Sequence, residues 1–66
     1  MTLIYPESDL PVLIGDEVTS FRGELYTVTG WREPQHAGST GRVYVKNEKG
    51  HTREFFPSVF DLLFVD

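Results

Sequence analysis

Turn-forming residues divide this chain into segments that are too short for a regular helix. They recur roughly every eight to twelve residues, at positions 15–16, 22–23, 34–41, 49–50 and 57–58. Between them lie short runs rich in β-branched and aromatic residues, and helical periodicity is not sustained in any of them. This spacing is typical of small barrels and sandwiches, so we predict an all-β fold.

The runs between the turns predict the elements one by one. Residues 1–14 form an N-terminal arm or extra strand, and residues 15–66 form a five-stranded unit. Its strands are expected within residues 17–21, 25–32, 42–46, 51–56 and 62–65. Residues 57–61 read as one helical turn before the last strand, and Gly50 suits the positive φ of the hairpin loop at 47–50.

Alternation along each strand predicts which side chains face inward. In 42–46, Val43 and Val45 point to the core and Arg42, Tyr44 and Lys46 point outward. Counting through 25–32 places Trp31 on the same face as residues 25, 27 and 29. Residues 55 and 56 are adjacent phenylalanines, so one should be buried and the other should form part of an exposed apolar patch.

The chain has 66 residues and no cysteine, so its core must hold the fold without disulfides or thiolate metal sites. A domain near this size has little interior for a catalytic cavity. His36 and His51 lie on a loop and a hairpin strand, too few and too separate for a zinc site. We therefore expect no catalytic residue, no metal and no cofactor.

The formal net charge of -4 conceals an uneven distribution. The first seventeen residues carry four acidic side chains and no basic one, whereas all six basic residues lie between Arg22 and Arg53. Nucleic-acid binding would require these basic residues to converge on one face, because phosphate contacts dominate such affinity.

The order of elements resembles that of SH3-like small barrels of the KOW or Tudor type. The resemblance is carried by the opening Gly15-Asp16-Glu17-Val18 and by the ending 56–60, Phe-Pro-Ser-Val-Phe, where such folds place a 3₁₀ turn. It implies an SH3-like barrel over residues 15–66, of a type seen in bacterial or phage accessory proteins. The chain departs from KOW motifs, since Glu24 follows Gly23, and from polyproline-binding domains, since Trp31 stands alone.

We predict a non-enzymatic module for protein–protein interaction, which uses an aromatic and basic sheet face and the long loop at 33–41. Aromatic rings beside guanidinium groups suit stacking on a partner. The partner-binding candidates are Trp31, Arg32, His36, Arg42, Tyr44, Lys46 and Arg53. The alternative is a nucleic-acid-associated module that uses the basic residues of the same face.

Two expectations concern assembly and location. The arm at 1–14 can add a strand in cis or in a neighbouring copy, which would give a dimer, and we favour the arrangement in cis. A charged leader and a long apolar stretch are both missing from the sequence. A cytoplasmic protein without membrane contact is therefore expected, as a monomer or an arm-mediated homodimer.

Overall fold

The computed structural model describes all 66 residues. It contains seven strands and one 3₁₀ turn. These are β1 (Thr2–Tyr5), β2 (Leu10–Pro11), β3 (Glu17–Thr19), β4 (Leu25–Arg32), β5 (Arg42–Lys46), β6 (Thr52–Phe55), η1 (Pro57–Phe60) and β7 (Leu63–Val65). The all-β prediction is confirmed, as are the limits of β4 and β5 and the single turn before the last strand.

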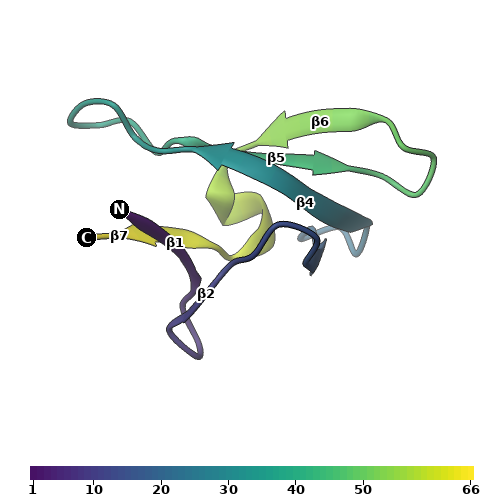
Figure 1. Ribbon diagram of the computed structural model, residues 1–66, viewed down its shortest axis with the longest axis horizontal. Helices are drawn as coiled ribbons and strands as arrows, with labels where there is room; N and C mark the ends of the chain where they lie inside the picture. Colours follow the sequence, from purple (N-terminus) through teal and green to yellow (C-terminus); the bar gives the residue numbers. More distant parts are fainter.

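The strands form two antiparallel sheets, which corrects the prediction of one closed, five-stranded barrel. The larger sheet has the order β3-β4-β5-β6 and the smaller one the order β2-β1-β7. Figure 1 shows the larger sheet above the smaller one, with η1 between them. After η1 the backbone turns at Asp61, which has φ 55°, and β7 pairs with β1 and not with β6.

One hydrophobic core lies between the two sheets. Val28, Val43 and Val45 of the larger sheet are almost fully buried. The burial of Val43 and Val45 was predicted from the alternation in 42–46. The rings of Tyr26, Phe55 and Phe60 pack edge to face, with centroids 5.4–5.7 Å apart. The arm completes this core with Leu3 and Val12. Residues 1–14 are therefore part of the folded unit.

A β-bulge in β4 overturns the predicted orientation of Trp31. Val28 lies opposite Val45, but the register then shifts, so that Gly30 lies opposite Tyr44 and Trp31 opposite Val43. Directly opposite residues share a face of the sheet. Trp31 therefore points inward, where it packs against the core. The extra residue in the bulge reverses the alternation, which counting along the sequence could not foresee.

The arm pairs with the end of the same chain. β1 pairs with β7 of the same chain, and Leu3 lies opposite Phe64. The hydroxyl of Tyr5 donates a 2.7 Å hydrogen bond to the carboxylate of Asp16, which also accepts the amide of Leu13 at 3.0 Å. These bonds hold the arm against the start of β3.

Candidate protein-binding surfaces

The larger sheet presents a basic and aromatic surface on the side away from the core. The register places Arg32 opposite Arg42, and Tyr44 opposite Glu54. We call this surface the outer face. It consists of the residues of β5 that alternate with the buried valines, and of the residues next to them on β4 and at β6. It comprises Arg32, Arg42, Tyr44, Lys46, Glu54 and Phe56. Four of the seven predicted candidates therefore lie together.

One carboxylate is shared by two arginines on the outer face. The same oxygen of Glu54 lies 3.9 Å from Arg32 Nη2 and 3.8 Å from Arg42 Nε. Both distances exceed the 2.7–2.9 Å or so of a charge-assisted hydrogen bond. Since the three side chains are about one third to one half exposed, these ion pairs contribute little stability. Both guanidinium groups therefore keep free donors for another acceptor.

Arg42 is held more firmly than Arg32. Its Nη1 donates a 2.7 Å hydrogen bond to the carbonyl of Gly41, and its guanidinium lies 4.1 Å from the centroid of the Phe56 ring. Phe56 is 49% exposed, whereas Phe55 on the opposite face packs against the core, as alternation predicted. The result is a preorganised pair of a cation and an exposed ring.

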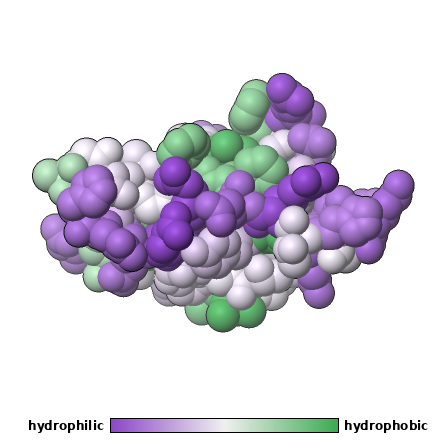
Figure 2. All heavy atoms as spheres, turned by 90° about the horizontal axis from the view of Figure 1, so that it is seen from above, coloured by the Kyte–Doolittle hydropathy of each residue, from purple (hydrophilic) through white to green (hydrophobic).

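Tyr44 lies over a position that has no side chain. A Cβ on Gly30 would come 3.5 Å from Tyr44 Cδ2, so the ring covers the glycine on the neighbouring strand. Figure 2, which views the molecule from above, shows a band of hydrophilic side chains with separate hydrophobic patches on both sides of it. Polar and apolar groups are thus adjacent on this side of the molecule.

The other three candidates lie elsewhere. Trp31 faces the core, and Arg53 lies opposite Val45, so its side chain starts from the inner face at the exposed edge strand β6. His36 is exposed in the loop, where its Nδ1 donates a 3.0 Å hydrogen bond to the carbonyl of Ala37. The predicted pairing of Trp31 with Tyr44 on one face is therefore wrong.

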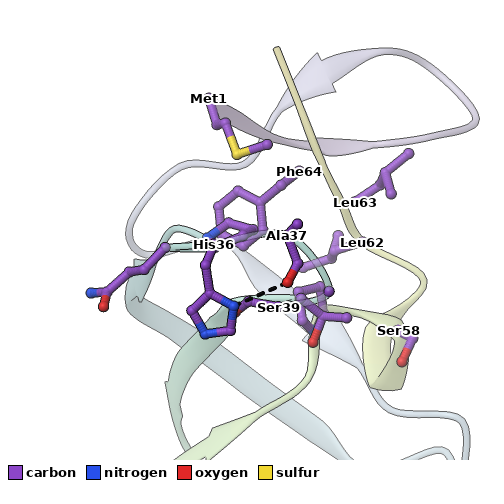
Figure 3. A pocket seen from close by; sticks show the side chains of 13 residues that line it. Met1, His36, Ala37, Ser39, Ser58, Leu62, Leu63 and Phe64 are labelled. Atoms are coloured by element: carbon purple, nitrogen blue, oxygen red, sulfur yellow. Dashed lines mark hydrogen bonds between the residues drawn. The ribbon is translucent and has the colours of Figure 1, made fainter.

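The loop at 33–41 forms one wall of a groove of about 580 Å³. We call this the loop groove. Its other walls are Met1, residues 57–58 at the start of η1 and residues 62–64 leading into β7. Figure 3 shows Phe64 and Leu62 near Ala37 of the loop and Met1 above them, whereas the side chain of Leu63 points away from the loop. The sequence indicated the loop as a candidate, but the apolar wall comes from segments far away in the chain.

Gly41 allows the loop to close onto β7. It has φ +70°, and a Cβ there would come 2.5 Å from the carbonyl oxygen of Arg32 and 2.8 Å from the ring of Phe64. Only glycine combines this backbone conformation with so close an approach. The base of the loop is therefore packed directly on the ring of Phe64.

A second groove lies on the other side of the segment from η1 to β7. It has a volume of about 780 Å³ and runs between residues 5–8 of the β1–β2 turn and residues 58 and 60–63. Glu7 and Asp61 lie on it, and it has no basic lining residue. The two grooves share Ser58, Leu62 and Leu63, so a partner could span both.

The two side chains whose hydrogen bond fastens the arm, Tyr5 and Asp16, have shifted pKa values. Burial, together with the hydrogen bond to Asp16, raises the pKa of Tyr5 to about 12. The amide of Leu13, followed by the hydroxyl of Tyr5, lowers the pKa of Asp16. Both shifts follow from the contact that fastens the arm.

The structure contains no group of three or more histidine, cysteine, aspartate or glutamate side chains that could hold a metal ion. It also contains no helix with the length and apolar character needed to cross a bilayer. Among protein-family models, curated proteins and solved structures, no match to this chain is found.

Proposed function

We propose that this chain is a non-enzymatic protein-binding module that engages its partner through the outer face and the loop groove. The observation that carries the proposal is the stacking of Arg42 on the half-exposed Phe56, beside Arg32 and Tyr44. Arginine and aromatic side chains are enriched at protein interfaces and among the residues that dominate binding energy.

The proposal also includes membership of the SH3-like class of small domains. The order of β3, β4, β5, β6, η1 and β7 supports an SH3-like order of elements over residues 15–66, in which β7 pairs with β1 of the arm and the sheets are not closed into a barrel. It also extends to the cytoplasm, because a chain without cysteine gains nothing from an oxidising compartment.

The experiment is capture of proteins from a cell lysate on the immobilised chain, with quantitative mass spectrometry. We expect Arg42→Gln and Phe56→Ala each to reduce the captured amount of a specific partner by about tenfold or more. Lys49→Gln at the hairpin tip is the matched control and should retain it. Unchanged capture by both outer-face variants would contradict the proposal.

A second candidate is nucleic-acid binding, favoured by the convergence of Arg32, Arg42 and Lys46 around Tyr44 on one face. Glu54 opposes it, since its carboxylate lies among these cations. Fluorescence anisotropy with labelled single- and double-stranded oligonucleotides at about 50 mM salt tests it under favourable conditions. Binding there that weakens in Arg32→Gln would support this candidate, and the absence of binding would remove it.

A further inference from the structure

Strand β7 has a hydrogen-bonding edge that no other strand covers. β7 pairs only with β1, and Leu3 of β1 lies opposite Phe64. The carbonyl of Leu3 accepts the amide of Val12 at 2.8 Å, so the backbone groups of Leu3 point away from β7. Hydrogen-bonded and non-hydrogen-bonded pairs alternate in an antiparallel ladder, and the Leu3–Phe64 pair is therefore of the second type. The N–H and C=O of Phe64 consequently point away from β1.

The loop groove lies beside this edge. Phe64 and Leu63 belong to its lining, and the loop at 33–41 forms the facing wall. The backbone hydrogen bonds between turns and loops include none from the loop to β7. The loop therefore does not pair with the backbone N–H and C=O of Phe64, although its base contacts the Phe64 ring.

The groove is suited to an uncharged occupant. Its lining includes no carboxylate and no lysine or arginine side chain, and His36 is its only ionisable side chain. The terminal ammonium of Met1 is paired with Glu33 at 3.4 Å. Leu63, which is 50% exposed, offers apolar surface at the rim. A charged segment would lose hydration here without gaining an ion pair.

We propose that the loop groove binds an extended, uncharged segment of a partner protein, which adds as a strand to the edge of β7 at Phe64. This inference rests on the proposed protein-binding function and assigns a binding mode to its loop. Main-chain hydrogen bonds supply affinity in strand addition, and alternate side-chain contacts supply specificity.

A second copy of the chain is a poorer occupant. Antiparallel pairing of two β7 strands about Phe64 would place the carboxylate of Asp66 opposite Leu62 twice. Each copy also carries a net charge of -4, so the two would repel each other. The segment of another protein avoids both costs.

The test uses the full ¹⁵N-labelled chain and an end-capped hexapeptide of alternating threonine and valine, followed by NMR. In the free protein, the amide of Phe64 should exchange rapidly with solvent. Saturating peptide should slow that exchange about tenfold or more and shift resonances in 34–40 and 62–64. Leu63→Lys should weaken binding about tenfold, because it places a charge on apolar contact surface. Leu25→Lys, at a comparably exposed position on the larger sheet, should bind as the parent does.

The peptide itself supplies the sharpest control. A hexapeptide with alternate N-methylated amides keeps its side chains but loses the donors that strand pairing requires, and it should not bind. Equal binding of this peptide, or of glutamate–valine and lysine–valine versions, would overturn the inference. So would slow exchange of the Phe64 amide in the free protein, absence of shifts in the groove, or a doubled mass by light scattering.

Failure of this inference can be distinguished from failure of the proposed function. Lys49→Gln lies outside both the groove lining and the outer face, and it should bind the hexapeptide as the parent does. If lysate capture depends on Arg42 and Phe56 but the hexapeptide does not bind, only the strand-addition inference is wrong.

Discussion

The contact between Tyr5 and Asp16 shows how single side chains fasten the arm. One carboxylate accepts both the hydroxyl of Tyr5 and the amide of Leu13, eleven and three residues away in the chain. Each of these hydrogen bonds alone makes a modest net contribution to stability. Together they hold the end of β1 and residue 13 close to the start of β3.

Stability should depend on pH through this contact. The pKa of Tyr5 is about 12 in the fold against an ordinary value of 10.0. The contribution of Tyr5 to the free energy of unfolding is therefore complete below pH 10, and it is lost as the pH rises from 10 to about 12. The pKa of Asp16 is lowered, so its contribution is present above its ordinary value of 3.8 and is lost as the pH falls through the lower folded value.

Urea denaturation followed by circular dichroism at several pH values measures this dependence. Tyr5→Phe should lower the urea midpoint at pH 7. Above pH 10, the midpoint of this variant should fall less steeply with pH than that of the parent. Tyr44→Phe is the matched control, because the Tyr44 hydroxyl has no hydrogen-bond partner within the chain. A Tyr5→Phe midpoint equal to that of the parent at pH 7 would argue against a stabilising role.

Gly41 should tolerate substitution worse than Gly38, although both have positive φ. In Gly41→Ala, the new methyl group meets the Arg32 carbonyl and the Phe64 ring in addition to the left-handed backbone cost. In Gly38→Ala, nothing lies within 4 Å, and only the backbone cost of about 1–2 kcal/mol applies. We expect Gly41→Ala to lower the free energy of unfolding by at least about 3 kcal/mol, measured by urea denaturation. Equal costs at the two sites would show that the loop base is not packed on β7.

At the scale of elements, the bulge in β4 decides which surface the protein presents. It allows Tyr26, Val28 and Trp31 to face the core from one strand, although regular alternation would put Trp31 outside. It also brings Gly30 under Tyr44 on the outer face. One inserted residue thus moves the only tryptophan from the predicted binding surface to the core.

Trp31→Ala should consequently be a stability variant. We expect the free energy of unfolding to fall by about 2–3 kcal/mol, somewhat less than for a fully buried ring. Leu25→Ala, at a largely exposed position on the same strand, should cost less than about 1 kcal/mol. Circular dichroism in urea measures both variants. If Trp31→Ala unfolds at the parent midpoint, Trp31 does not support the core.

At the scale of the whole molecule, two small sheets depend on one core. The smaller sheet consists of strands from the two ends of the chain, and the apolar faces of both sheets contribute to a single core cluster. Leu3 and Val12 from residues 1–14 pack in the same cluster as Val28 and Val43. The arm and residues 15–66 should therefore fold together.

Removal of residues 1–14 tests this dependence. The shortened chain loses two core residues and leaves β7 without its partner, so we expect no cooperative thermal unfolding transition by calorimetry. The full chain should unfold cooperatively and have a mass of 7.5 kDa by light scattering, because β1 pairs in cis. A cooperative transition in the shortened chain would establish residues 15–66 as an independent domain.

Local features were predictable wherever a residue's own chemistry decided the outcome. The run 25–32 is a strand because β-branched and aromatic residues fill it, and Gly50 adopts φ 82° at the hairpin as expected. The opposite orientations of residues 55 and 56 follow from alternation. Alternation also places Arg42, Tyr44 and Lys46 on the outer face, whereas Arg32 lies there only because of the bulge in β4. Trp31 was misplaced because a bulge leaves no distinct mark in a sequence that alternates on both sides of it.

The regularly spaced turn residues determined by themselves that this chain forms short strands, since each turn limits how far any regular element can extend. Which strands meet was decided by the tertiary structure. Pairing between β1 and β7 joins residues more than 55 positions apart, and its free energy comes from burying Leu3 in a core that exists only when both sheets are present. The loop groove arises in the same way, because Met1, Phe64 and the loop at 33–41 become neighbours only after that pairing has formed.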